Sequence, residues 1–204
     1  MVNSTKESIA LFGGSFDPFH DGHKDIVYKA LDILDISKIV LMPTYLNPFK
    51  KSSLINADKR LEFVRLALDK VDRVEVEDYE IKANRSVYTF ESIEYLQKRY
   101  DVKYIIIGAD NLEDLRKWSK FEWLNRNFIW VIASRKGYNF NCDFLDRYIS
   151  LFVDRDISST EIRSGKNFNQ VDKRLVTSLK EIINKRKNNE HRWESKKDST
   201  DARW

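Results

Sequence analysis

The sequence predicts an α/β protein in which a doubly wound parallel sheet carries helices on both faces. Short apolar runs alternate along the chain with stretches whose apolar residues recur at helical spacing, and this alternation is typical of successive strand and helix units. The run KYIII at residues 103–107 is unbroken and β-branched, which indicates a central strand buried on both faces. The 204 residues suffice for one such domain. We expect it to occupy residues 1–184, followed by a polar, basic tail over residues 185–204 that is frayed or disordered.

Composition and charge exclude several classes of protein. The formal net charge is +4, yet residues 185–204 alone contain seven Lys and Arg against four Asp and Glu. The predicted domain is therefore nearly neutral, and we expect no nucleic-acid partner. No window reaches the ~18 apolar residues of a membrane span. The single cysteine, Cys142, cannot form an internal disulfide, and no Cys or His cluster has metal-site spacing. We expect a cytoplasmic protein with no membrane partner and no metal site of its own.

Residues 9–23, IALFGGSFDPFHDGH, combine a strand with a loop and a helix start. The apolar beginning predicts a buried strand, the two glycines and Asp-Pro predict a turn, and Asp21 is a candidate N-cap. The helix after it would place on one face Ile26, Val27, Ala30, Leu31 and Leu34. Glycine lets a backbone approach a ligand, and free N–H groups at a helix start attract anions. The loop therefore suits a polyphosphate, with His20 and His23 on one side of the first helical turn.

The remaining elements follow the same alternation. Further strands are predicted over residues 38–42, 73–76, 128–133 and 149–153. Two further helices are predicted, one opened by Asp58 with Leu61, Val64 and Leu68 on its apolar face, and one capped by Thr89 with Ile93 and Leu96. Ligands of an open parallel sheet bind beyond the carboxyl ends of its strands. Asp110, just after the central strand, could there accept hydrogen bonds from ribose hydroxyls or cap the next helix.

A second helix start follows the last predicted strand. Ser158 and Glu161, three residues apart, form a capping box, so a helix begins here. Ser159, Thr160 and Arg163 add two hydroxyls and a guanidinium to the free N–H groups of its first turn. Two anion-binding helix starts on one sheet imply a nucleoside triphosphate held along its phosphate chain.

Two motifs carry a family resemblance. GGSFDPFHDGH at residues 13–23 resembles the GxFDPxHxGH signature of nucleotidyltransferases that move a nucleoside monophosphate from ATP or CTP onto a phosphate, and ISSTEIR at residues 157–163 resembles their ISSTxIR element. The resemblance spans roughly residues 8–166 and implies a Rossmann-like sheet of the nucleotidyltransferase type. It implies an ATP site made of Gly13, Gly14, Ser15, Phe16, His20, His23, Gly108, Asp110, Ser159, Thr160 and Arg163.

Weaker matches indicate the acceptor substrate. The loop 43–51 resembles the segment that carries the family's phosphate-binding base, which implies Lys50 with Lys51 as an alternative. NRSVYTFESI at residues 84–93 resembles the SYTxxTL stretch of nicotinate mononucleotide adenylyltransferases, with Val87 inserted and Ser92 in place of Thr. Trp118 resembles the tryptophan that flanks their pyridine ring, although core packing would also explain it. The implied nicotinate mononucleotide site is Asn47, Lys50, Tyr88, Thr89, Asp110 and Trp118.

The resemblance implies transfer of AMP from ATP to nicotinate mononucleotide, giving deamido-NAD and pyrophosphate in NAD biosynthesis, with Mg²⁺ carried on the ATP phosphates. An ionised phosphomonoester can attack the α-phosphate itself, so the protein need only align the substrates and stabilise charge. His20, His23, Lys50 and Arg163 are the candidate catalytic residues. A phosphopantetheine adenylyltransferase, a cytidylyltransferase and a non-catalytic nucleotide sensor remain as alternatives. The sequence leaves open whether the chain forms a homo-oligomer.

Overall fold

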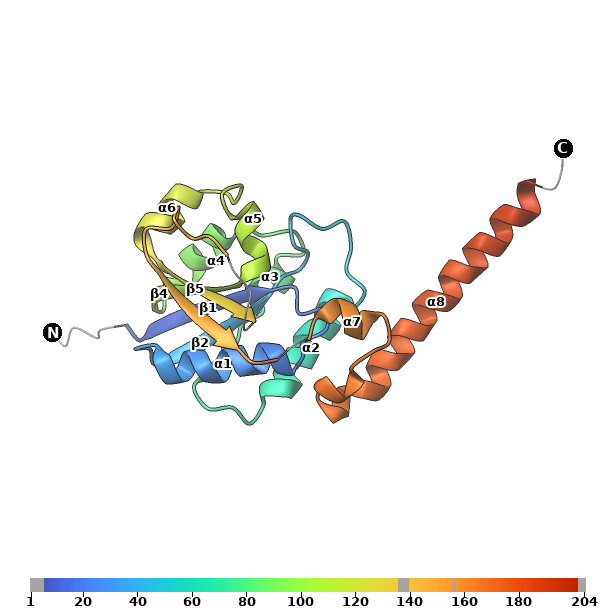
Figure 1. Cartoon of the computed structure of the whole chain (residues 1–204), viewed down its shortest axis with the longest axis horizontal. Coiled ribbons are helices and arrows are strands. Elements are labelled where there is room, and N and C mark those ends of the chain that lie inside the picture. The colour runs from blue at the N-terminus through green and yellow to red at the C-terminus, as the bar shows by residue number, and fades with distance from the viewer. Residues whose placement is uncertain (1–5, 136–139, 156, 202–204) are drawn as a thin grey trace.

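A six-stranded parallel sheet forms the centre of the described molecule (Figure 1). The structure is a computed structural model and describes residues 6–135, 140–155 and 157–201. The strands are β1 (Ser8–Gly14), β2 (Lys38–Pro43), β3 (Val74–Val76), β4 (Asp101–Gly108), β5 (Ile129–Arg135) and β6 (Tyr148–Val153). Their order is β3-β2-β1-β4-β5-β6, and every neighbouring pair is parallel. The predicted doubly wound sheet is confirmed, with its order reversing at β1 and β4.

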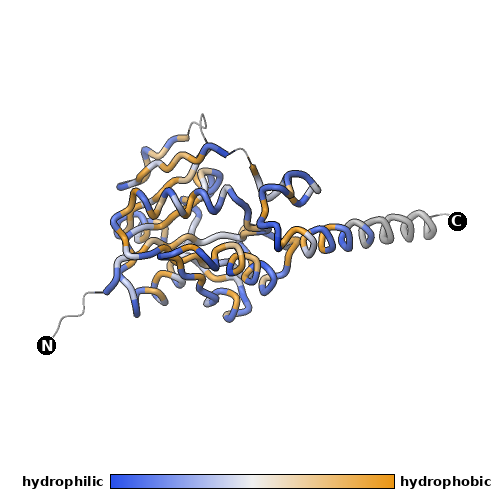
Figure 2. The backbone as a smooth tube through the Cα atoms, turned by 90° about the horizontal axis from the view of Figure 1, so that it is seen from below, coloured by the Kyte–Doolittle hydropathy of each residue, from blue (hydrophilic) through white to orange (hydrophobic). Residues whose placement is uncertain are grey.

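Helices cover both faces of this sheet. One face carries α1 (Asp21–Ile33), α2 (Ala57–Leu68), α7 (Ser159–Arg163) and the first part of α8 (Lys173–Asp201). The other carries α4 (Thr89–Leu96), α5 (Leu112–Leu115) and α6 (Phe121–Asn127). The short elements α3 (Tyr79–Lys82), η1 (Ala109–Asn111) and η2 (Phe168–Gln170) lie in the connections. Side chains alternate along β1, so that Ala10 and Phe12 join the first core while Ile9 and Leu11 join the second. Figure 2 shows the apolar stretches gathered in the strands and in the helices packed on them.

Three helix starts differ from the prediction by one or two residues. The N-cap of α1 is His20, not Asp21, because the extended backbone at His20 lets its carbonyl accept the N–H groups of His23 and Lys24 at 2.9 and 3.2 Å. The helix assigned to Asp58 begins at Ala57, where the Asn56 side chain accepts the Lys59 N–H at 2.8 Å.

At α4 the N-cap is Tyr88, so Thr89 is the first helical residue and not the cap. The Glu91 carboxylate accepts the Tyr88 backbone N–H at 3.0 Å, as the third helical residue does in a capping box. The capping box of Ser158 and Glu161 at α7 is confirmed.

The C-terminal part of the described chain is one helix. α8 leaves the body of the molecule and continues to Asp201 (Figure 1). Ile183 is the last of its described side chains to be buried in the core. A continuous helix crosses residue 184, so no break in the backbone marks the predicted domain boundary there. The boundary and the frayed tail stay predictions. None of the described helices, α8 included, is apolar enough over sufficient length to cross a bilayer.

Candidate active site

A cavity of about 800 Å³ opens where β1 and β4 end. This is the point at which the strand order reverses, so the loops after the two strands separate and leave a crevice between them. All the residues predicted for catalysis or substrate binding line it, namely Gly13, Gly14, Ser15, Phe16, His20, His23, Asn47, Lys50, Tyr88, Thr89, Gly108, Asp110, Trp118, Ser159, Thr160 and Arg163. The roles assigned to these residues stay predictions, but the fold brings them to one place.

The loop after β1 is shaped by a tight contact between glycine and phenylalanine. A Cβ on Gly14 would lie 2.9 Å from the Phe16 ring, so only glycine leaves that ring its position. Phe16 itself adopts φ 46°, a left-handed conformation that costs a non-glycine residue about 1 kcal/mol or more. Packing compensates, because the Phe16 ring meets Phe12 at 5.3 Å and Phe19 at 5.5 Å between centroids. Gly13 has open space around its Cβ position, which leaves its backbone accessible to a ligand.

His23 is held among aromatic rings in a defined tautomer. Its ring stacks on His20 with centroids 3.8 Å apart and on Phe19 at 5.2 Å. The His20 backbone N–H donates to His23 Nδ1 at 3.2 Å. Since Nδ1 accepts, the proton of the neutral ring lies on Nε2, which becomes a donor. Burial first, and then the neighbouring His20, lowers the pKa of His23 well below its ordinary value, so the ring is neutral at pH 7.

The segment around α7 is bonded directly to the loop after β1. Ser159 Oγ donates to the Pro18 carbonyl at 3.1 Å, and Arg163 Nη1 donates to the Asp17 carbonyl at 2.6 Å. Arg163 Nη2 also donates to Thr160 Oγ1 at 2.8 Å. A Cβ on Gly22 would lie 3.0 Å from Ile157, so the glycine lets the start of α1 approach this segment. Ser159 and Arg163 therefore hold the two predicted anion sites together besides lining the cavity.

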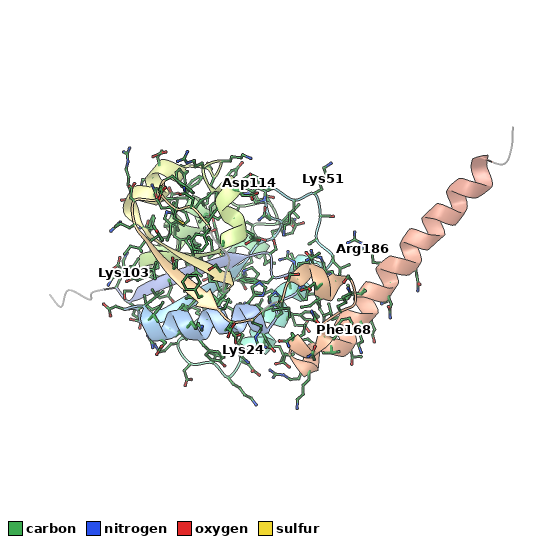
Figure 3. The ribbon with its side chains drawn as sticks, viewed as in Figure 1. Lys24, Lys51, Lys103, Asp114, Phe168 and Arg186 are labelled. Atoms are coloured by element: carbon green, nitrogen blue, oxygen red, sulfur yellow. The ribbon has the colours of Figure 1, made fainter. Side chains whose placement is uncertain are left out.

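The two candidate lysines are separated by the structure. Lys50 Nζ lies 3.4 Å from Ser15 Oγ and lines the cavity. Lys51 is exposed, is not among the cavity-lining residues, and stands at the outer edge of the same loop in Figure 3. Asn47 shapes this loop, because its side-chain oxygen accepts the Phe49 N–H at 2.8 Å. The geometry favours Lys50 over Lys51 as the phosphate-binding base.

Away from the loop after β1, the cavity is lined by aromatic side chains. Tyr88 is 48% exposed and stacks on Phe90 with centroids 6.1 Å apart. Trp118 is half-buried, meets Trp130 edge-on at 6.1 Å and also lines the cavity. It therefore packs on the core, and its role beside a pyridine ring stays a prediction. A flat ring could stack on these side chains.

Asp110 lies at the end of β4, between the two ends of the cavity. It caps neither η1 nor α5, whose N-caps are Gly108 and Asn111. Asn111 Nδ2 donates to Asp110 Oδ1 and to the Gly108 carbonyl, each at 3.2 Å. A Cβ on Gly108 would lie 2.4 Å from Asp110 Oδ1, so the glycine leaves room for that carboxylate. The alternative role of a helix cap is wrong for Asp110, and its predicted ribose contact remains a prediction.

Several lining residues were missed by the sequence reasoning. Thr44 Oγ1, Glu80 Oε2 and Ser134 Oγ are buried, line the cavity, and lack a hydrogen-bond partner among the described residues. Buried polar atoms are almost always satisfied in proteins, so these three indicate positions for a ligand or water. Arg155, which bonds Asp25 Oδ2 through Nε at 2.6 Å, adds a cation beside the cavity. The only available signal was position, since Thr44, Ser134 and Arg155 end or follow strands.

Glu80 is a carboxyl group buried at 4% exposure. Ser92 Oγ donates to its Oε1 at 2.7 Å, which does not offset the loss of hydration. Burial raises the pKa of Glu80 to about 8. At pH 7 the group is therefore a neutral acid, which does not repel an anionic ligand in the same cavity.

Metal ions in proteins are held by sets of ligand side chains. Over the described ranges, no three His, Cys, Asp or Glu side chains are grouped so that they could hold an ion.

Comparison with known proteins places this chain in a family. The cytidylyltransferase-like family model matches residues 11–165. A protein of Sulfurovum sp. named probable nicotinate-nucleotide adenylyltransferase is 46% identical over 187 residues, which cover 92% of this chain and 100% of that protein. A protein of Aliarcobacter butzleri with the same name is 40% identical and covers 88% and 99%.

Solved structures show the same fold at lower identity. Plasmodium falciparum nicotinic acid mononucleotide adenylyltransferase complexed with NaAD matches with a TM-score of 0.68 at 18% identity, covering 88% of this chain and 95% of that one. The same enzyme complexed with APC gives a TM-score of 0.63 at 17% identity, covering 89% and 96%. With the family model over most of its length and relatives at this identity over nearly all of theirs, the chain belongs to the nicotinate-nucleotide adenylyltransferases of the cytidylyltransferase-like family.

Proposed function

We propose that this cavity transfers AMP from ATP to nicotinate mononucleotide, giving deamido-NAD and pyrophosphate in NAD biosynthesis. The observation that carries the proposal is the single cavity shared by the loop after β1 and the aromatic end near Trp118. ATP would lie with its phosphates over the first, and the pyridine ring of the acceptor would lie against the second. The acceptor phosphate and the ATP α-phosphate then meet between β1 and β4.

The reaction needs alignment and charge stabilisation more than proton transfer. An oxygen of the acceptor phosphate forms a bond to the α-phosphorus, and the bond from that phosphorus to the bridging β-oxygen breaks, so that its electron pair leaves with pyrophosphate. Neutral His23 donates through Nε2 to phosphate oxygens, and His20 stands stacked beside it. Lys50 and Arg163 stabilise the negative charge that builds on the transferred and leaving groups. Mg²⁺ carried on the ATP phosphates would neutralise part of that charge.

The acceptor is recognised by shape and stacking. Trp118 and Tyr88 offer aromatic faces, and Thr89 begins α4 with its backbone N–H in the first turn. Free N–H groups in that turn favour a carboxylate over an amide, which favours the nicotinate over the nicotinamide nucleotide. Asp110 and Asn47 complete the set as candidate contacts to the ribose and phosphate.

The setting follows from the same substrates. Both are soluble anions, and the one cysteine, Cys142, is free and buried, so the chain has no disulfide of its own that would need an oxidising compartment. We therefore assign the enzyme to the cytoplasm, without nucleic-acid or membrane partners.

The test is pyrophosphate release with Mg²⁺ and ATP, offering nicotinate mononucleotide, nicotinamide mononucleotide and phosphopantetheine in parallel. Strong preference for nicotinate mononucleotide, with deamido-NAD identified by mass, is the expected result. A preference for phosphopantetheine would show that phosphopantetheine, and not nicotinate mononucleotide, is the acceptor substrate. Tight ATP binding with no release for any acceptor would favour a nucleotide sensor instead.

A further inference from the structure

Arg60 is a buried arginine that lies outside the cavity but directly behind its loops. It projects from the first turn of α2 and is 1% exposed. Neighbouring positions on the same helix face are filled by core residues such as Phe63 and Val64. Burial lowers the pKa of Arg60 from its ordinary value, though not enough to remove the charge. Burying a cation is unfavourable unless hydrogen bonds or an opposite charge compensate for its lost hydration.

The guanidinium makes four hydrogen bonds to backbone carbonyls. Nη1 donates to Ser15 at 2.5 Å, Nη2 donates to Thr44 and Tyr45 at 2.7 Å each, and Nε donates to Ile55 at 3.0 Å. Ser15 belongs to the loop after β1, whereas the other three belong to the segment after β2. Only a planar group with five donors can satisfy acceptors spread in this way.

Asp17 makes a second link between the same two segments. Its carboxylate, 6% exposed, accepts the backbone N–H groups of Leu54 and Ile55 at 2.8 and 2.9 Å. The segment that carries Lys50 is therefore fixed to the loop after β1 at its beginning by Arg60 and at its end by both residues. Lys50 lies between these fixed ends, with its Nζ 3.4 Å from Ser15 Oγ.

We propose that Arg60, assisted by Asp17, is a positioning residue for the transfer reaction, which sets Lys50 and the loop after β1 at the separation that one phosphate chain requires. The proposal rests on the proposed function, because the phosphate chain is what both segments would contact. Arg60 touches no substrate and acts through Lys50 and Ser15. Charge stabilisation falls steeply when its donors are displaced, so an error of about 1 Å at Lys50 costs turnover up to roughly 100-fold.

Arg73 provides a matched control within the chain. It also bonds three backbone carbonyls, those of Leu31, Ile36 and Ser37. These acceptors lie before β2, at the opposite end of the sheet from the cavity. Arg60→Lys and Arg73→Lys therefore both remove guanidinium bonds to backbone carbonyls, although Arg73 is exposed and Arg60 is buried. Only the first substitution loosens the segment that carries Lys50.

The experiment measures kcat, the KM of each substrate and the free energy of unfolding for both variants, with amide hydrogen exchange of residues 44–55. We expect Arg60→Lys to lower kcat roughly 10- to 100-fold, with a smaller effect on the KM for ATP, and to speed exchange in residues 44–55. Arg73→Lys should keep kcat within about 2-fold, with a smaller loss of stability because its side chain is exposed. In a Lys50→Ala background, Arg60→Lys should cost much less kcat, because Lys50 is the group it positions.

If the wild-type chain is active, three kinetic results would overturn the positioning role. These are an unchanged kcat in Arg60→Lys, equal losses in Arg60→Lys and Arg73→Lys, or full additivity with Lys50→Ala. If Arg60→Lys does not fold, Asp17→Asn applies the same test from the other end of the segment, with the same expectations. A wild-type chain that releases no pyrophosphate with any acceptor would refute the proposed function instead, and unchanged exchange in residues 44–55 would then refute the positioning role independently.

Discussion

Replacing Glu80 with glutamine should change how the stability of the protein depends on pH. Glutamine keeps the shape of the side chain and can still accept the hydrogen bond from Ser92 Oγ. The substitution removes the carboxyl group that gains and loses a proton. The pKa of Glu80 is about 8 in the folded chain, against an ordinary value of 4.5. Between these two pH values the folded chain retains a proton that the unfolded chain has released.

The sign and size follow from proton linkage. Unfolding releases one proton in this window, so the free energy of unfolding falls as pH rises, by about 1.4 kcal/mol per pH unit. Below pH 4.5 the group makes no difference, and above about 8 the penalty is complete. From pH 5.5 to 7.5 the wild type should lose roughly 3 kcal/mol relative to Glu80→Gln. At 4% exposure, solvent screens little of this effect.

Urea unfolding at several pH values, followed by tryptophan fluorescence, measures the difference directly. The dependence on urea must be equal in both proteins, so that only stability is compared. Glu91→Gln is the control. Its hydrogen bond with Arg85 lowers the pKa of Glu91, so this carboxylate is ionised in both states above pH 5.5 and adds no slope of its own. Because the charge of Glu91 also helps to raise the pKa of Glu80, Glu91→Gln should keep the slope and move its upper end to lower pH. Parallel curves for the wild type and Glu80→Gln would show that Glu80 is ionised in the folded protein and would refute the reasoning.

Three substitutions in the cavity test the assigned roles. His23→Ala should lower kcat roughly 100- to 1000-fold in pyrophosphate release, with little change in the KM for ATP; wild-type turnover would remove His23 from the mechanism. Trp118→Ala should raise the KM for nicotinate mononucleotide roughly 3- to 10-fold and leave that for ATP unchanged, whereas an equal rise in both would indicate a folding defect. Lys50→Ala should lower kcat/KM at least roughly 10-fold while Lys51→Ala stays within about 2-fold, and the reverse order would move the phosphate contact to Lys51.

Sequence reasoning identified the residues that can be recognised from their immediate neighbours in the chain. The loop after β1 combines two glycines, a proline and two histidines in one short window, and each of these residue types is typical of a turn or of a ligand site. The sheet was predictable for a similar reason, since the apolar run of β4 and the alternation of elements need no long-range information. The exact first residues of the helices were less predictable. His20 caps α1 through its backbone, and histidine is not among the residues whose side chains mark a cap.

The groups that support the site could not be found in this way, because their partners lie far away in the chain. Arg60 bonds Ser15, 45 residues earlier, and Asp17 bonds Ile55, 38 residues later. Within its own helix, Arg60 is only a polar interruption of an apolar face, which a sequence argument assigns to a solvated edge. Yet these long-range bonds decide where the locally recognisable residues stand. A relative that kept both histidines and Lys50 but changed Arg60 would retain the motif and, on this reasoning, lose most of the turnover.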